Sequence, residues 1–335
     1  MEDFQLKRRL IERGHLKDWS KRGHIRRADH ARFLKTLLRI GLRMTGLGRR
    51  GKTNALQPVI EHVRFEFDHL PERFEGFRIL HLSDIHADGL VELPDVLHEK
   101  LKQLQADLCV LTGDYRFAVR GLCDDVYSNM ERILAGVNSQ HGILGVLGNH
   151  DSEAMVPEFE RMGVRMLMNE SHAIQADDDT LWFIGLDDPH YYGCADLPGA
   201  IQQVPEDAFK ILLVHTPEVF HDAHEHGIHL YLCGHTHGGQ IRLPLVGPVF
   251  THSNAPRKFS RGVWRYNNVQ GYTSSGVGCS GVVARFLCPP EIVMIELAKT
   301  QTPRTQSRSD VKVEITFDEV SANRHQSSLI YDFSH

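Results

Sequence analysis

The stretch of sequence that decides the fold runs FRILHLSDIHADGLVELPDVLHEKLKQLQADLCVLTGD over residues 77–114. It begins and ends with short apolar runs, at residues 77–82 and 108–112, and a helical pattern occupies residues 93–104 between them. Continuous apolar runs are typical of strands buried on both faces, and two parallel strands need a crossover segment such as a helix. The stretch therefore predicts a strand, a helix and a second strand that lies parallel to the first.

Further apolar runs extend this pattern along the chain. A second helical pattern, over residues 122–137, leads into the next run. The predicted strands after the opening stretch are residues 143–147, 181–186, 211–214, 228–233, 239–243, 263–266, 269–273 and 292–297. Strands that alternate with helices are typical of an α/β fold with a largely parallel sheet. The number of strands favours two sheets packed together between helices.

The charged residues are distributed unevenly along the chain. Its 335 residues have a formal charge of -5, but residues 1–52 hold 16 Lys or Arg and only 5 Asp or Glu. The remainder is therefore strongly acidic. A basic arm favours an anionic surface as its partner. The acidic remainder argues against a nucleic-acid partner and against a nuclease, because surfaces that bind nucleic acid are normally basic.

The cysteines and the hydropathy bound the location of the chain. The six cysteines form no Cys-x-x-Cys pair, and no apolar run approaches the roughly 18 residues that a membrane-spanning helix needs. The N-terminus also has no uninterrupted apolar core of the kind found in signal peptides. We therefore expect a reduced, cytoplasmic protein that can bind peripherally to the inner face of a membrane.

Composition divides the chain into three regions. These are a basic leader at residues 1–55, a catalytic domain at residues 56–300 and a polar tail at residues 301–335. Within the tail, residues 311–320 alternate between apolar and polar side chains. Alternation of this kind predicts one further strand.

The leader contains a cationic amphipathic pattern. Over residues 31–47, basic side chains recur at spacings of three and four, and apolar side chains occupy the rest of the helical wheel. Such a helix can lie on an anionic membrane, here through residues 28–50, or it can pack on the catalytic domain. A nucleic-acid arm is a weaker third reading, because few aromatic residues are interleaved with the basic ones.

Polar side chains follow most of the predicted strands at the point where each apolar run stops. These candidates are Asp84, His86, Asp114, Asn149, His150, Asp151, His215, His235 and His237. Ligands of open α/β sheets collect at the carboxyl ends of strands, and buried charged groups need partners or metal ions. Nitrogen and oxygen ligands without thiolate suit Mn²⁺, Fe²⁺ or Zn²⁺. The sequence therefore predicts a metal site at this edge.

The same residues form blocks that resemble the calcineurin-like metallophosphoesterase family. The blocks are Asp-x-His at residues 84–86, Gly-Asp at 113–114, Gly-Asn-His-Asp at 148–151, the later His215, and Gly-His-x-His at 234–237. The resemblance spans roughly residues 60–298. It is closest to a bacterial, membrane-associated phosphodiesterase-like subgroup in which GHTHGGQ, at residues 234–240, and FLCPPE, at residues 286–291, occur together.

The resemblance implies both an architecture and a metal centre. The implied fold is a four-layer α/β/β/α sandwich of two mixed sheets flanked by helices, the metallo-dependent phosphatase type. The implied centre holds two divalent ions. Asp84, His86 and His237 would bind the first ion, Asn149, His215 and His235 the second, and Asp114 would bridge them.

The implied reaction is hydrolysis of a phosphodiester, a phosphomonoester or a pyrophosphate through attack by a metal-bridging hydroxide. His150 resembles the family histidine that contacts the scissile phosphate and protonates the leaving oxygen, and Asp151 would orient it. The arginine that the subgroup commonly carries near the glycine-rich stretch is missing from residues 274–278. Substrate choice is therefore expected to depend on other groups, such as the loop at residues 188–192 and the basic leader.

Two alternative functions stay open. The leader favours a lipid-linked substrate, and some relatives of the subgroup resemble enzymes that split the pyrophosphate of UDP-2,3-diacylglucosamine in lipid A synthesis. The alternative from a different class is a non-catalytic scaffold, because the fold includes members that bind partners after losing metal ligands. All seven ligand positions are present in this sequence, which favours the enzyme.

Overall fold

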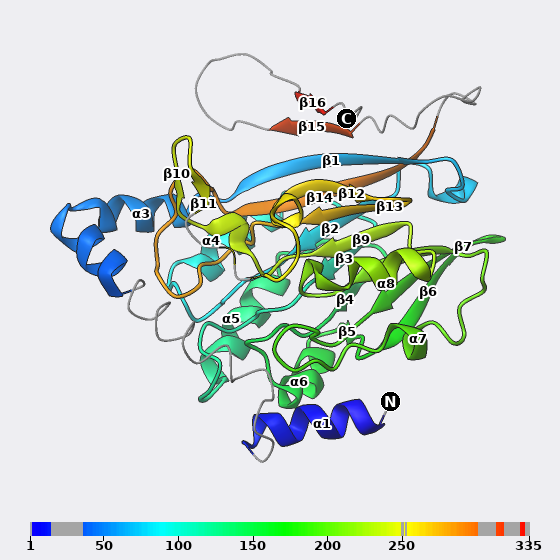
Figure 1. Ribbon diagram of the computed structural model, residues 1–335, viewed down its shortest axis with the longest axis horizontal. Helices are drawn as coiled ribbons and strands as arrows, with labels where there is room; N and C mark the ends of the chain where they lie inside the picture. The colour runs from blue at the N-terminus through cyan, green and yellow to red at the C-terminus, as the bar shows by residue number, and fades with distance from the viewer. Residues whose placement is uncertain are drawn as a thin grey trace.

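Two mixed β-sheets pack face to face in the computed structural model of the chain (Figure 1). The structure describes residues 2–14, 36–248, 251, 253–300, 313–317 and 329–331. Helices cover the outer face of each sheet. The structure therefore confirms the predicted four-layer α/β/β/α sandwich.

The first sheet has its strands in the order β16-β15-β1-β14-β2-β3-β4-β5. Strands β2 to β5 are parallel, β14 is antiparallel to β2, and β1 is parallel to β14. The bounds are β1 Val59–Phe67, β2 Arg78–Leu82, β3 Leu108–Leu111, β4 Ile143–Gly145, β5 Val164–Met166, β14 Glu291–Lys299, β15 Val313–Phe317 and β16 Leu329–Tyr331.

The second sheet has the order β12-β13-β9-β8-β7-β6. Its four inner strands are parallel to one another, and the edge strands β12 and β6 are antiparallel to them. The bounds are β6 Glu170–Ala176, β7 Asp179–Gly185, β8 Phe209–Leu213, β9 Leu230–Cys233, β12 Gly262–Tyr266 and β13 Val269–Thr273. A small separate hairpin joins β10 Arg242–Leu243 to β11 Gly247–Pro248.

Helices α4, α5 and α6 cover the first sheet, and α7 and α8 cover the second. The leader supplies α1, a helical stretch at residues 36–44, and α3. The bounds are α1 Glu2–Glu12, α3 Leu47–Ala55, α4 Leu93–Leu101, α5 Asp124–Leu134, α6 Val156–Arg161, α7 Leu197–Ala200 and α8 Phe220–Glu225. Short 3₁₀ turns are η1 Glu72–Phe74, η2 Glu153–Met155, η3 Pro217–Val219, η4 His237–Gly239 and η5 Arg257–Phe259. Among the described residues, no helix is long and apolar enough to cross a bilayer.

The apolar runs that predicted the strands are continuous because both faces of each sheet are covered. In β2, Ile79 packs in the layer between the two sheets, whereas Leu80 and Leu82 pack under the helices of the first sheet. Leu108 and Leu111 of β3 divide in the same way. Burial on both faces removes the polar alternation that marks a strand with one wet face.

Several expectations need correction or refinement. The predicted strand at residues 239–243 is wrong over its first half, because Gly238 and Gly239 have φ of 57° and 84° and form the turn η4 instead. The predicted tail strand is present as β15, which pairs antiparallel with β1 in a backbone register that places residue 61 opposite residue 317. Residues 31–35 of the predicted leader helix lie outside the described residues, and residues 36–44 are helical as expected.

Candidate metal centre

The seven predicted ligands all lie at one edge of the sandwich. Those from the first sheet follow β2, β3 and β4, and those from the second follow β8 and β9. The loops of both sheets therefore converge there. Six of the seven side chains are buried, and that of Asn149 is partly buried.

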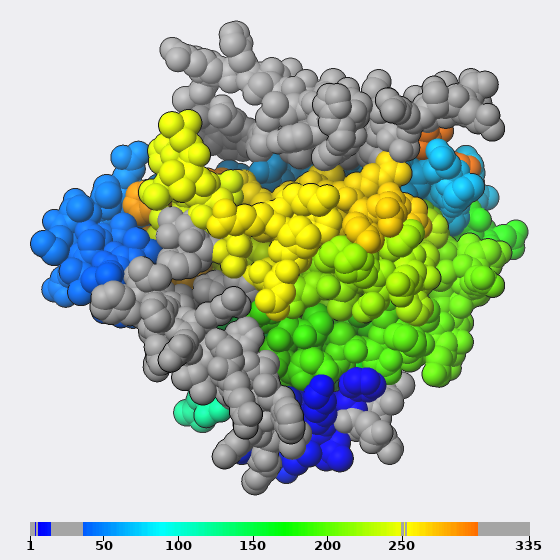
Figure 2. Space-filling view, in the orientation of Figure 1, coloured from blue at the N-terminus to red at the C-terminus, as the bar shows by residue number. Residues whose placement is uncertain are grey.

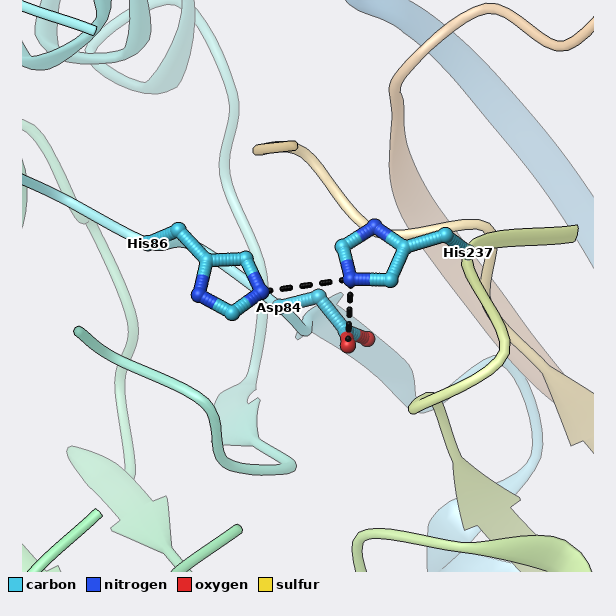
Figure 3. Close-up of side chains that lie close together, drawn as sticks. All are labelled: Asp84, His86 and His237. Carbon is cyan, nitrogen blue, oxygen red and sulfur yellow. Dashed lines mark hydrogen bonds and ion pairs between the residues drawn. The ribbon is translucent and has the colours of Figure 1, made fainter. Parts of the chain in front are cut away.

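A first cluster joins Asp84, His86 and His237 (Figure 3). The Nε2 atoms of His86 and His237 are 3.2 Å apart, and His237 Nε2 is 3.2 Å from Asp84 Oδ1. Figure 3 shows the two ring nitrogens turned toward each other beside the carboxylate. Two imidazole lone pairs and a carboxylate oxygen that converge in a buried space are a ligand arrangement suited to a divalent cation.

A second cluster joins Asp114, Asn149, His215 and His235. His215 Nε2 is 3.3 Å from Asp114 Oδ2 and 3.1 Å from Asn149 Oδ1. His235 Nδ1 is 2.9 Å from the same Asn149 oxygen. These four side chains thus present two nitrogen and two oxygen atoms to one point.

Asp114 lies between the two clusters. Its Oδ2 atom is 3.8 Å from His86 Nε2 on one side and 3.3 Å from His215 Nε2 on the other. One carboxylate is therefore within reach of ions in both clusters. This position fits the bridging role that the resemblance implies.

The backbone at the centre adopts an unusual conformation. Five of the seven ligand residues have φ in the left-handed region, namely Asp84 (51°), His86 (44°), Asp114 (59°), His235 (71°) and His237 (51°). Side chains other than glycine rarely adopt this region, and such residues concentrate at functional sites. The surrounding fold therefore holds these ligands in a conformation that a free chain would seldom visit.

Backbone carbonyls fix the orientation of two ligand rings. The Nδ1 atom of His86 is 2.7 Å from the carbonyl oxygen of Arg116, and the Nδ1 atom of His215 is 2.7 Å from that of Thr112. A proton on each Nδ1 leaves the Nε2 lone pair free to bind a metal ion. Both rings are therefore held in the tautomer that the proposed coordination requires.

The charges in the centre also fit bound cations. Burial raises the pKa of Asp84 to about 6 and lowers the pKa of His86 to about 3. Burial opposes ionisation of Asp114, yet the imidazoles of His215 and His150 hold its pKa well below the usual range. Within the described part of the chain, the buried Asp84 Oδ1 accepts no hydrogen bond. A divalent ion would satisfy that oxygen and offset the cost of burying carboxylates.

His150 borders the centre. Its Nε2 atom is 3.9 Å from Asp114 Oδ2, its Nδ1 atom is 2.8 Å from the carbonyl oxygen of Phe117, and its side chain retains 17% exposure. The ring is therefore anchored at Nδ1 and accessible at the other nitrogen. This geometry suits contact with a bound substrate.

The predicted role of Asp151 needs correction. Its buried carboxylate accepts hydrogen bonds from the backbone N–H groups of Asp114 (2.7 Å), Tyr115 (2.8 Å) and Gly148 (2.8 Å). A buried carboxylate is stabilised by such donors, and these three occupy both of its oxygens. Asp151 therefore joins two ligand loops, whereas the carbonyl of Phe117 orients His150.

Comparison with known proteins agrees with this geometry. Residues 77–239 match the family model for calcineurin-like phosphoesterases. This segment belongs to that family. This segment begins just before β2 and ends at η4, so it contains all seven metal-ligand candidates. Membership implies phosphoester hydrolase activity that depends on divalent metal ions.

Three curated relatives of this calcineurin-like phosphoesterase are bacterial. The uncharacterized metallophosphoesterase YkuE of Bacillus subtilis is 28% identical over 274 residues, which cover 77% of this chain and 92% of YkuE. The uncharacterized metallophosphoesterase YkoQ of the same organism is 27% identical over 238 residues, which cover 69% of this chain and 86% of YkoQ. The phosphodiesterase YaeI of Escherichia coli is 27% identical, over 71% of this chain and 88% of YaeI.

Arginines near the centre of this phosphoesterase were not predicted from sequence. Arg285 is fully buried and donates to the carbonyl oxygens of Ser275 (2.8 Å) and Gly276 (3.0 Å). It thus brings a guanidinium to the glycine-rich turn, where the sequence shows no arginine. Arg116 donates through Nε to the carbonyl oxygen of His150 at 2.6 Å. In the sequence, each of these two arginines is marked only as a charged residue among largely apolar neighbours.

The loop after β7 borders the second cluster. The buried Asp188 carboxylate accepts hydrogen bonds from the N–H groups of Tyr191 (2.6 Å) and Tyr192 (2.8 Å), which folds the loop into a tight turn. The ring of His190 then lies 4.5 Å from that of His235, measured between ring centroids. The loop therefore borders the second cluster on this side.

Proposed function

We propose that this chain is a dinuclear-metal phosphoesterase that hydrolyses a phosphodiester, with phosphomonoesters and pyrophosphates as related substrates. The observation that carries the proposal is the pair of ligand clusters that share the Asp114 carboxylate. Two Mn²⁺, Fe²⁺ or Zn²⁺ ions held there would activate water and offset charge on the phosphoryl oxygens.

The protein's own groups would complete the reaction. His150 presents Nε2 toward the centre, and the carbonyl of Phe117 fixes the other side of its ring. In its imidazolium form it can donate the Nε2 proton to the leaving oxygen, which needs this proton when it would otherwise leave as an alkoxide. The bond from Arg116 to the His150 carbonyl holds the backbone that carries the ring.

Replacement of the shared carboxylate tests the proposal. With Mn²⁺ added, the wild-type chain should hydrolyse bis(4-nitrophenyl) phosphate, and Asp114→Asn should reduce the rate by about 100-fold or more because both ions lose a charged ligand. Asp124→Asn is the matched control, because Asp124 is exposed at the start of α5. Absence of hydrolysis by the wild-type chain with each of the three metals would refute the proposal.

We extend the proposal to a lipid-linked substrate at an anionic membrane surface, such as the cytoplasmic face of the inner membrane. The helical stretch at residues 36–44 exposes Leu37 (48%), Ile40 (49%) and Met44 (82%). Exposed apolar side chains on a cationic helix are typical of segments that enter the headgroup region.

A basic cavity beside this stretch supports the same extension. Arg39, Arg43 and Arg49 line a cavity of about 930 Å³ together with Phe117, whose carbonyl holds His150. Within the described residues, neither Arg43 nor Arg49 forms an ion pair. Guanidinium groups suit phosphate groups, so an anionic headgroup could reach the metal centre from this side.

Vesicle binding tests the extension. Co-sedimentation with phosphatidylglycerol vesicles should weaken about tenfold when Leu37, Ile40 and Met44 are replaced by serine, because the apolar anchor is lost. Leu245→Ser is the matched control, since Leu245 is fully exposed near the β10–β11 hairpin. Equal sedimentation of all three proteins would refute membrane binding through this stretch.

The alternative pyrophosphatase function has its own assay. Release of UMP from UDP-2,3-diacylglucosamine would support it, and hydrolysis of simple phosphodiesters without UMP release would exclude it. The scaffold alternative has less support, because neither cluster lacks a predicted ligand. A scaffold would bind no stoichiometric pair of ions.

A further inference from the structure

The N-terminal helix α1 packs beside the metal centre although it precedes the family-matched segment by more than sixty residues. Figure 1 shows α1 alongside α6, and Figure 2 shows it in dark blue at the lower edge of the molecule. Its Arg8 is completely buried. A buried guanidinium is costly unless hydrogen-bond acceptors and opposite charges surround it, so its partners indicate what it supports.

Arg8 holds the loop that carries Asn149 and His150. Its Nη2 atom donates to the carbonyl oxygen of Asp151 at 2.7 Å and to that of Gly148 at 3.3 Å. These two carbonyls lie immediately on either side of the Asn149–His150 pair. The guanidinium therefore fixes both ends of the short segment that provides a ligand and the expected proton donor.

The same guanidinium holds the loop after β7. Its Nη1 atom donates to the buried carboxylate of Asp187, and its Cζ atom lies 4.0 Å from the centroid of the Tyr192 ring. Lys7 adds a bond to the carbonyl oxygen of Gly193 at 2.6 Å. This loop carries His190, whose ring contacts His235. One side chain thus connects two loops that border the second cluster.

Glu12 extends this contact by one helical turn. It accepts hydrogen bonds from Arg8 Nε (2.9 Å), Ser152 Oγ (2.8 Å) and the N–H of Glu153 (2.9 Å). The backbone that follows Asp151 is therefore bound to α1 as well. Together, Arg8 and Glu12 fix residues 148–153 along their length.

We propose that Arg8 is a positioning residue for the phosphoesterase reaction, and that α1 straps Asn149 and His150 into place at the second cluster. This inference rests on the proposed function. The planar guanidinium reaches carbonyls, a carboxylate and an aromatic face at once, whereas the single ammonium of lysine cannot match that geometry. Without Arg8, the carbonyls of Gly148 and Asp151 lose a donor. A misplacement of the loop by about 1 Å can reduce turnover about 100-fold.

The test compares Arg8→Lys and Arg8→Ala with Arg9→Ala. Arg9 is on the same helix and pairs with Glu153 at 2.6 Å, but its side chain is 53% exposed, which makes it the matched control. In both Arg8 variants we expect the second Mn²⁺ to bind about 10-fold more weakly while the first binds normally. The kcat for bis(4-nitrophenyl) phosphate should fall about 10- to 100-fold with little change in KM. Arg9→Ala should resemble the wild type.

Hydrogen exchange measures whether α1 holds the loop in place, independently of catalytic activity. The backbone amides of residues 148–153 should exchange faster in Arg8→Lys than in the wild type, while those of β2 and β3 stay protected. This variant retains a positive charge at position 8, so we expect it to fold. Added ethylguanidinium should partly restore Arg8→Ala. Unchanged second-ion affinity and unchanged exchange in both Arg8 variants would refute the strap. A wild-type chain that binds two ions without hydrolysing any phosphoester would refute the proposed function instead.

Discussion

His150 is anchored at one ring nitrogen and accessible at the other. If it protonates the leaving oxygen, His150→Gln should reduce kcat/KM about 100- to 10,000-fold for a phosphodiester with an alkyl leaving group. The reduction should be much smaller for 4-nitrophenol, which leaves without a proton. His221→Gln is a suitable control, because His221 pairs with Tyr266 on the outer side of the second sheet. Equal losses for both leaving groups would contradict the role.

Gly234 gives the loop after β9 a close approach to the first cluster. A Cβ atom at this position would lie 1.9 Å from Ser83 Oγ and 2.2 Å from Asp84 Oδ2. Gly234→Ala should therefore displace the Asp84 carboxylate and weaken binding of the first Mn²⁺ about 10- to 100-fold, as measured by calorimetric titration. Gly41→Ala is the control, because a Cβ there meets no atom within 4 Å. Wild-type affinity in Gly234→Ala would show that the contact has no effect.

Residue types at strand ends were enough to predict which side chains meet at this edge, but not the groups that support them. Asp84 and His237 stand in motifs whose spacing is visible in the sequence. Asp151 stands beside His150 in sequence, yet its carboxylate binds the N–H groups of a different loop. Arg8 is about 140 residues from its carbonyl partners. Contacts of this kind depend on the packed fold, so local patterns carry no trace of them.

Strands β1 and β14 bury a pair of acidic side chains, Glu61 and Glu291. Burial, followed by the charge of Glu291, raises the pKa of Glu61 to about 8, while Arg261 opposes the shift. A carboxyl whose pKa is raised on folding contributes to stability at pH values below its unfolded-state pKa. This contribution is lost as the pH rises through the folded-state pKa. The loss should therefore occur between about pH 4.5 and pH 8.

Glu61→Gln removes this titration. Relative to the wild type, its free energy of unfolding should increase by about 2–4 kcal/mol between pH 5 and pH 9. Urea unfolding at several pH values measures this difference. A difference between the two proteins that stays constant with pH would mean that Glu61 titrates normally in the fold.

Elements with continuous apolar runs could be predicted, whereas others could not. Strand β3 is buried throughout and matches its predicted run closely. Strand β6 is only partly buried at an edge, so its sequence ESHAIQA has little apolar content to mark it. At η4, glycines with positive φ replace the predicted start of a strand. Helix α1 has a strongly charged sequence, and the buried Arg8, together with Lys7 and Glu12, connects it to loops far away in the sequence.

At the scale of the whole molecule, the metal centre joins the two sheets. The first cluster takes Asp84 and His86 from the first sheet and His237 from the second. The second cluster likewise combines Asp114 with His215 and His235. Each ion would therefore be held by loops of both sheets. This explains why the ligands are spread over most of the catalytic domain yet meet at one edge.

The number of divalent ions bound at full activity tests the two-metal account most directly. Chelator-treated protein would be titrated with Mn²⁺ while bound ion and hydrolysis of bis(4-nitrophenyl) phosphate are followed in the same sample. The account predicts that activity reaches its plateau when two ions per chain are bound. Full activity with one ion or none, or two bound ions without any hydrolysis, would contradict it.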